Sequence, residues 1–175
     1  MRIDCGSDAS YKDVNGDTWK TDEDFIKTGD NKQVPQHSSS KVEQLNTLRV
    51  FTEQNKNCYT LPTPTSTRYL VRAMFLYGNY DGLSKPPTFD LEFDGNKWAT
   101  VVTSMTNFTY NEMIYATKGE SISICLARTK DQQFPFISRL ESMPLLADMY
   151  AQMRRDMAWF NSYRYNYGVN DRILG

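Results

Sequence analysis

The sequence of 175 residues is poor in histidine, and this scarcity limits the chemistry that it can perform. Its one histidine, His37, lies in the polar, serine-rich stretch 36–40. A Ser-His-Asp or Cys-His nucleophilic system would depend on that single residue, and a metal centre built from histidines is excluded by count. A lone histidine in a polar loop is more often an idle surface residue, which is how we interpret His37.

Charge of one sign and long apolar runs are also lacking. The formal net charge is −1 and no block of basic residues occurs, which argues against nucleic acid as a partner. No stretch approaches the roughly 20 apolar residues of a membrane span. The opening Met1–Gly6 passes directly into polar sequence, so we expect no secretory signal within it, although a mature chain without its leader would look the same.

Cysteine is scarce and widely spaced. Cys5, Cys58 and Cys125 show no C-x-x-C spacing, so a zinc site is not expected. Three cysteines allow one disulfide, in any of three pairings, with one thiol left over. Three buried free thiols are equally compatible with the count.

Tyrosine, in contrast, is abundant. Aromatic residues make up 13% of the chain, with 11 Tyr against 3 Trp, a surplus that suits either a β-sandwich core or a binding face. The first 40 residues are turn-rich and polar. We expect long N-terminal loops there, held to the body by large side chains such as Trp19 and Phe25.

Strand-like segments then follow at fairly regular spacing, with no helical pattern between them. They are Leu45–Glu53, Arg68–Tyr77, Thr88–Asp94, Trp98–Thr103, Glu112–Thr117, Ser121–Ala127 and Phe136–Met143. Arg68–Tyr77 is almost continuously apolar, as expected for a strand covered on both faces. We predict a turn at Leu61–Pro64 and a hairpin across Lys118–Glu120. The pattern indicates an all-β sandwich.

The C-terminal part has a different period. Leu146, Met149, Met153, Met157 and Phe160 recur every three or four residues, which predicts a short amphipathic helix. After it, Asn161–Gly175 resembles an incomplete strand element, because tyrosines alternate at positions 163, 165 and 167.

Two features have a chemical and a purely structural interpretation. Asp90, Glu92 and Asp94 share one strand face and could form a glycosidase pair or a calcium site, but the solvated half of an amphipathic strand is the better interpretation. The stretch Asn107-Phe108-Thr109 is a glycosylation sequon of a kind expected by chance in a chain of this composition.

The stretch Gly78–Gly82 is the most promising binding loop. Tyr77 and Tyr80 could stack on a sugar ring, while Asn79 and Asp81 could hydrogen-bond its hydroxyls. The alternative is a glycine-rich turn whose tyrosines only pack.

Several motifs occur in the order found in one known family. They are Ile3-Asp4-Cys5-Gly6, Trp19–Phe25 with Thr28-Gly29, Leu48–Phe51, Asn57-Cys58-Tyr59, Arg68–Gly82, Phe89–Gly95, Ile124-Cys125-Leu126 and Phe136–Glu141. Over residues 3–145, and again at Tyr165–Gly168, they resemble the malectin-like domain of plant receptor-like kinases, often found beside leucine-rich repeats.

The resemblance implies a jelly-roll-like, galactose-binding-like β-sandwich over residues 1–145, with 146–175 a helical linker and the start of a truncated second lobe. It implies a secreted, non-catalytic module at the apoplastic face of the plasma membrane, without a cofactor, and an oxidising compartment that favours one disulfide. The implied ligands are a cell-wall glycan or a peptide, with a co-receptor as a further partner.

The resemblance also bears on the binding loop. Tyr77 matches one sugar-binding tyrosine of malectin, but Gly78 stands where malectin has a second aromatic residue. A structural protein–protein interaction module, or a receptor fragment without sugar binding, is the alternative function. An enzyme that uses Asp90 and Glu92 is a third, less favoured class.

Overall fold

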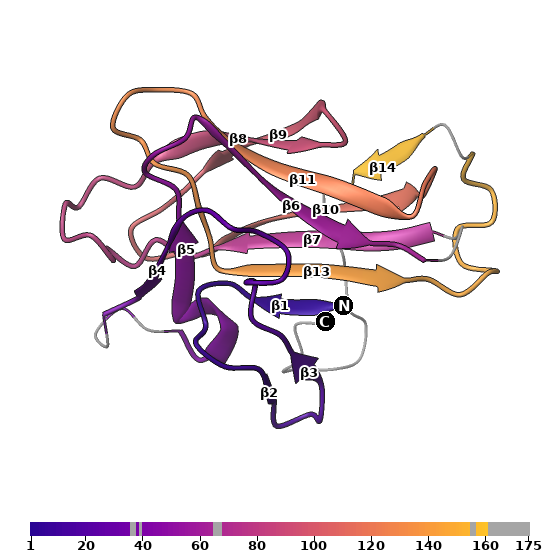
Figure 1. Cartoon of the computed structure of the whole chain (residues 1–175), viewed down its shortest axis with the longest axis horizontal. Coiled ribbons are helices and arrows are strands. Elements are labelled where there is room, and N and C mark those ends of the chain that lie inside the picture. Colours follow the sequence, from indigo (N-terminus) through magenta and orange to yellow (C-terminus); the bar gives the residue numbers. More distant parts are fainter. Residues whose placement is uncertain (36–37, 39, 65–67, 155–156, 161–175) are drawn as a thin grey trace.

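Two antiparallel sheets packed face to face form the body of the molecule. The computed structural model describes residues 1–35, 38, 40–64, 68–154 and 157–160, so His37 lies outside the described residues. The five-stranded sheet has the order β1 (Arg2–Asp4), β13 (Arg139–Pro144), β7 (Arg68–Phe75), β10 (Thr109–Ala116), β14 (Ala158–Phe160). The four-stranded sheet has the order β6 (Lys56–Pro62), β11 (Ser121–Arg128), β8 (Thr88–Phe93), β9 (Asn96–Val102) (Figure 1). The predicted all-β sandwich is confirmed.

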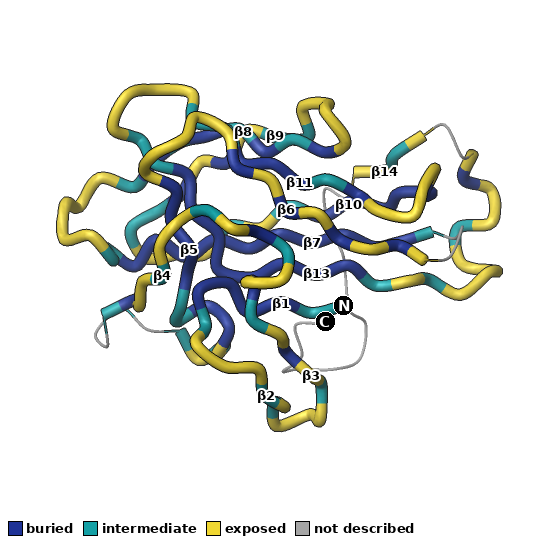
Figure 2. Tube along the Cα trace, in the orientation of Figure 1, coloured by how far each residue is buried: buried dark blue, intermediate teal, exposed yellow. Residues whose placement is uncertain are grey.

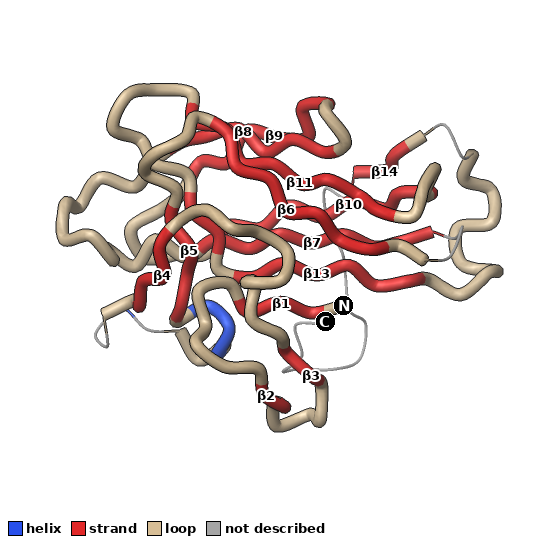
Figure 3. The backbone as a smooth tube through the Cα atoms, in the orientation of Figure 1, coloured by secondary structure: helices blue, strands red, loops and turns tan. Residues whose placement is uncertain are grey.

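Smaller elements close one side of this body. The strands β12 (Phe136–Ile137), β5 (Thr47–Val50) and β4 (Asp30–Gln33) form a third sheet, and β2 (Tyr11–Lys12) pairs with β3 (Thr18–Trp19). Within the described residues the helical elements are limited to short 3-10 turns such as η2 (Glu43–Leu45), and loops connect the short N-terminal strands (Figure 3).

The core forms where the apolar faces of the two sheets meet. In β8, Phe89, Leu91 and Phe93 are buried and the residues between them are not, so the predicted alternation is confirmed. From Tyr69 onward β7 is buried on both faces (Figure 2). The ring of Phe75 meets that of Phe89 at a centroid distance of 5.5 Å, which joins the sheets directly.

Two of the sequence-based assignments near the sheet ends were wrong. Leu61 and Pro62 end β6, a strand with alternating burial, and do not form the predicted turn. The segments on either side of Lys118–Glu120 are not a hairpin, because β10 pairs with β7 and β14 whereas β11 pairs with β6 and β8. That connection therefore crosses from one sheet to the other.

The predicted C-terminal helix was also wrong. Backbone bonds from Met149 to Leu146 and from Met153 to Tyr150 form separate turns, and Tyr150 has a positive φ of 56° that interrupts any helix. Only Met153 of the proposed apolar stripe is buried, and β14 follows. The alternating tyrosines 163–167 lie outside the described residues.

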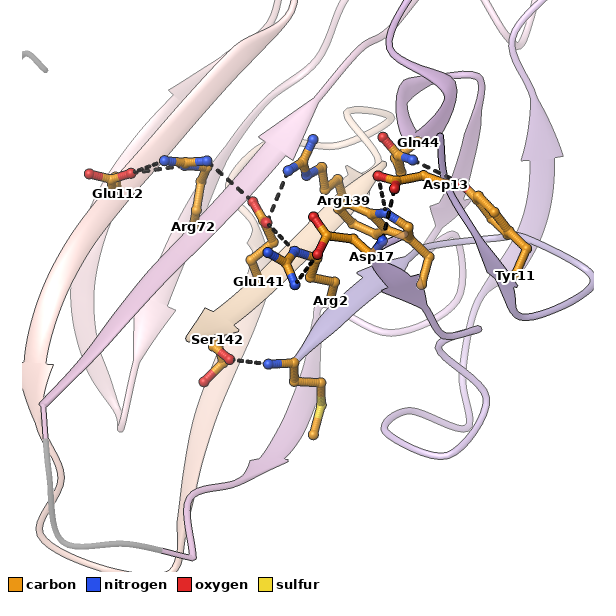
Figure 4. Close-up of polar contacts among 12 residues, drawn as sticks. Arg2, Tyr11, Asp13, Asp17, Gln44, Arg72, Glu112, Arg139, Glu141 and Ser142 are labelled. Atoms are coloured by element: carbon orange, nitrogen blue, oxygen red, sulfur yellow. Dashed lines mark hydrogen bonds and ion pairs between the residues drawn. The ribbon is translucent and has the colours of Figure 1, made fainter. Parts of the chain in front are cut away.

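A row of charges crosses the outer face of the five-stranded sheet. Strand register places Arg2 beside Glu141, Glu141 beside Arg72, and Arg72 beside Glu112. Arg72 binds Glu112 at 2.6 Å and Glu141 at 3.4 Å, and Arg139 binds Glu141 at 2.9 Å (Figure 4). The guanidinium of Arg139 also lies 4.4 Å from the centre of the Trp19 ring. Each buried charge of this row thus has an opposite partner.

A second buried ion pair fixes the N-terminal loops. Arg49 on β5 donates two hydrogen bonds of 2.7 Å to the fully buried Asp22, which also accepts one from the Tyr59 hydroxyl. The same guanidinium donates to the carbonyls of Thr28 and Gly29. One arginine therefore holds the loop between β3 and β4 against the body.

Replacing Arg49 tests this anchor. Arg49→Met leaves the Asp22 carboxylate buried without its cation, so we expect a loss of about 3–5 kcal/mol in the free energy of unfolding. Urea denaturation followed by far-ultraviolet circular dichroism measures it. Lys56→Met, which breaks the exposed pair with Glu92, is the matched control and should cost less than about 1 kcal/mol. Equal losses in the two variants would contradict the assignment.

Candidate functional site

The structure brings the four residues of the predicted binding loop together. This β7–β8 loop, residues 76–87, leaves the end of β7. The Tyr77 hydroxyl donates to the Asp81 carboxylate at 2.5 Å and accepts from the Lys85 amide at 3.1 Å. The Asn79 side-chain oxygen accepts from the Ser84 amide, and Asp81 also accepts from the Leu83 amide. The loop is therefore held by its own polar side chains.

The tyrosines of this loop face the body. Tyr77 is fully buried, and the partly buried Tyr80 packs against Phe136 with a centroid distance of 5.6 Å. Gly78 has a φ of 50°, and a Cβ there would lie 2.4 Å from Val34. An aromatic side chain therefore has no room at position 78. Sugar binding by Tyr77, Asn79, Tyr80 and Asp81 stays a prediction.

The three carboxylates of β8 and its turn are engaged separately. Asp90 binds Lys97 at 2.9 Å and accepts from the Thr100 hydroxyl. Glu92 binds Lys56 at 2.6 Å, and Asp94 accepts the Ser123 amide at 2.8 Å. The contacts with Lys97 and Thr100 lower the pKa of Asp90, so it is ionised at neutral pH. No group of three or more acidic, cysteine or histidine residues suited to a metal occurs among the described residues.

One disulfide links the four-stranded sheet. Cys58 on β6 and Cys125 on β11 face each other in register and are bonded, while Cys5 is a buried free thiol. Burial raises the pKa of the Cys5 thiol well above its ordinary value, so it is inert as a nucleophile. The bond selects one of the three pairings that the sequence left open.

The sequon lies at the same end of the sandwich as the β7–β8 loop. Asn107 is exposed in the bend between β9 and β10. The Thr103 hydroxyl, near the start of this bend, donates to the Pro87 carbonyl at 2.7 Å, which ties the bend to the β7–β8 loop.

A cavity of about 350 Å³ lies at the opposite end, which is roughly 20 Å away along β10. It is lined by Phe93, Asp94, Asn96, Lys97, Trp98, Met113, Tyr115, Lys118, Met157, Ala158 and Phe160. We call it the edge cavity, because β9 and β14 are edge strands of their sheets. Its volume suits one or two large side chains or a small ring.

Aromatic rings form the floor of the edge cavity. The Phe93 ring meets those of Tyr115 and Trp98 edge-on, at centroid distances of 4.6 and 6.1 Å. Burial and the neighbouring Asp94 carboxylate raise the pKa of Tyr115 to about 12, so its hydroxyl stays neutral. Lys97 and Lys118 supply the positive charge of the lining. The cavity thus combines an apolar floor with a polar rim.

The sequence did not predict the edge cavity. Its residues come from three segments that are far apart in the chain, 93–98, 113–118 and 157–160, and β14 lies where a helix was expected. The one local signal is Asp94-Gly95, the two-residue turn between β8 and β9, whose positive φ angles of 45° and 78° bend the chain sharply at the rim.

Fold and sites together define an antiparallel β-sandwich with polar rim loops, an architecture typical of binding domains. No helix of the described part of the chain is long and apolar enough to cross a membrane. Residues 3–174 match the family model of the malectin-like domain, and the chain belongs to this family.

Relatives in Arabidopsis thaliana support the assignment. The chain is 36% identical to the uncharacterized protein At1g24485 over 99% of its own length, and 36% identical to the receptor-like protein kinase At3g21340 over 98%. It spans 35% of the length of the first and 21% of the second. The plant receptor-like kinase FER has a solved structure that superposes with a TM-score of 0.73 at 19% identity, over 93% of this chain and 47% of that one. At this identity the superposition shows a shared fold.

The buried hydroxyl of Tyr77 predicts a loss of stability at alkaline pH. Burial and the Asp81 carboxylate raise its pKa to about 12, against about 10 in the unfolded chain. The neutral hydroxyl therefore stabilises the fold fully below about pH 10, and this contribution disappears as the pH rises to about 12. We expect Tyr77→Phe to reduce the decline in unfolding free energy over this interval, measured by urea denaturation. Tyr110→Phe, at an exposed position, is the control; a reduction of equal size there would refute the interpretation.

Proposed function

We propose that the chain is a non-catalytic, extracellular ligand-binding module that recognises a peptide or protein, on its own or with a co-receptor. The observation that carries the proposal is the edge cavity at the end of a malectin-like sandwich, where the exposed Met157 and Phe160 lie beside an aromatic floor. Receptor kinases among the relatives support the extracellular location. In another solved structure the peptide RALF23 is in complex with FER and LLG2, and a chain of that structure superposes on this one with a TM-score of 0.68 at 20% identity.

A cell-wall glycan is the second candidate ligand. It is favoured by the β7–β8 loop, which gathers Tyr77, Asn79, Tyr80 and Asp81 at one end of the sandwich. Against it, the Tyr77 and Asn79 oxygens are engaged within the loop and Tyr77 is buried, so little aromatic surface faces outward. The free energy of stacking on a sugar depends on such surface.

Screening the purified chain against a secreted-peptide library and a glycan array separates the two candidates. We expect peptide hits whose affinity falls about tenfold or more in Phe160→Ser, an exposed cavity residue, and is unchanged in Asp81→Ala. Glycan hits that depend on Asp81 and not on Phe160 would replace the peptide proposal by the glycan one. No hit of either kind would favour a structural interaction module.

We expect no hydrolytic activity toward cell-wall glucans. A retaining or inverting glycosidase needs one carboxyl kept protonated, whereas Asp90 has a lowered pKa and Glu92 is paired with Lys56. Reducing-end release from glucans should equal the blank. Release that is abolished by Asp90→Asn or Glu92→Gln would overturn the non-catalytic proposal.

Asn107 should carry an N-linked glycan if the protein is secreted. The side chain is exposed in a bend, where the glycosylation machinery can reach it. Expression behind a heterologous leader in plant cells should give a product whose mass falls on treatment with a peptide N-glycosidase. Asn107→Gln and Thr109→Ala should abolish that shift, whereas Thr109→Ser should retain it because it preserves the sequon. An unmodified secreted product would refute this prediction.

A further inference from the structure

The two sheets of the sandwich differ in width. The edge cavity lies where the narrower, four-stranded sheet ends and no longer covers the five-stranded sheet. The five-stranded sheet ends in β10 and β14, whereas the four-stranded sheet ends in β8 and β9. Strand β9 lies against β10, and the Phe93 ring contacts both Trp98 on β9 and Tyr115 on β10. Among the described strands, none of the four-stranded sheet lies beyond β9 to cover β14.

The inner face of β14 is therefore only partly covered. Register pairs Phe160 with Met113 and Ala158 with Tyr115, so Phe160 and Ala158 point toward the space between the sheets. Yet Phe160 is 57% exposed and the preceding Met157 is 46% exposed. Figure 2 shows this exposure along β14, in contrast to the buried strands beside it. Large apolar side chains on an inward face are normally covered by the opposite sheet.

Next to the uncovered face of β14 lies the outer edge of β9. Within the described residues β9 pairs with β8 alone, so its other edge has no partner strand, and of its backbone groups the Val102 carbonyl accepts from the Thr109 hydroxyl. A strand added to this edge would extend the four-stranded sheet by one position. It would then lie over β14, and its inward side chains would enter the edge cavity.

The geometry points to β-strand addition: an extended segment of a peptide or protein partner pairs with β9 and inserts an apolar side chain between Phe160 and the Phe93–Trp98 pair. The inference rests on the proposed function and names the mode of recognition. Backbone hydrogen bonds to β9 supply affinity, and the cavity selects large apolar side chains at alternate positions of the segment.

The charge around the cavity favours particular residues at the other positions of the bound segment, between its apolar side chains. The lining has two lysines and one carboxylate. The carboxylate of Asp94 is engaged by the Ser123 amide, and Lys97 is paired with Asp90. Lys118 pairs with no carboxylate of the described chain, and it lies where the chain crosses between the sheets. An acidic residue next to the apolar anchor complements this cation.

The probe is a synthetic peptide of about eight residues, a common strand length, in which Phe and Glu alternate. A second peptide has Lys in place of Glu, and a third has a central Pro that cannot pair as a strand. Titration into the ¹⁵N-labelled chain, followed by nuclear magnetic resonance, maps the contacts. We expect shifts in β9, β14 and the Trp98 indole, and slower amide hydrogen exchange along β9.

Matched variants make the result decisive. Phe160→Ser should weaken binding of the acidic peptide about tenfold, whereas Phe108→Ser, at an exposed aromatic residue outside the cavity, should not. Lys118→Glu should reverse the preference between the Glu and Lys peptides. Equal binding of all three peptides, shifts confined to other strands, or displacement of the peptide by a cell-wall oligosaccharide would overturn strand addition. Peptide ligands from the screen that depend on Phe160 but do not slow amide exchange along β9 would overturn strand addition and leave the proposed function intact.

Discussion

Each sheet has one apolar face, and mutual burial of these two faces is the constraint on which the rest of the structure depends. The rings of Phe75, Phe89 and Phe136 bridge the interface at centroid distances of 5.5–6.3 Å, so the sheets are joined by direct contact of large side chains. At about 25 cal/mol per Å² of apolar surface, burial of one such side chain stabilises the fold by about 1.5–3 kcal/mol, compared with about 0.5–1.5 kcal/mol for a typical hydrogen bond. The constraint also bears on function, because apolar side chains on the inner face of a sheet become available to a partner where the opposite sheet leaves them uncovered.

The buried charges serve a different purpose from the apolar core. Removing a carboxylate and a guanidinium from water costs about as much as their attraction returns, so the row Arg2–Glu141–Arg72–Glu112 adds little net stability. It does fix register, since sliding β7 by one residue along β10 would turn Arg72 toward the apolar interior and leave Glu112 without its cation. The Arg49–Asp22 pair acts similarly on the loop between β3 and β4, which it ties to β5.

Sequence patterns predicted the structural features that depend on residues close together in the chain. They missed the features that depend on residues far apart in it. The alternation in Thr88–Asp94 specifies a half-buried strand, and it was confirmed. The turn at Lys118–Glu120 was identified, but a turn within one sheet and a crossing between sheets have the same local sequence signal. Likewise, three- and four-residue spacing predicted a helix over residues 146–160, whereas an unfavourable φ at Tyr150 and pairing of Ala158–Phe160 with β10 produce turns and a strand. The disulfide pairing and the edge cavity required the register of separate strands.

The two ends of the sandwich differ in what they can offer a ligand. At the β7–β8 loop, the Tyr77 and Asn79 oxygens already have partners within the loop, so a ligand there must compete for hydrogen bonds that are already made. At the edge cavity, Phe160 is exposed and the outer edge of β9 has no partner strand within the described residues, so a ligand there gains burial and backbone hydrogen bonds in exchange for water. A segment that binds beside β9 would cover Met157 and Phe160, which are exposed, and leave the hydrogen bonds of the β7–β8 loop intact.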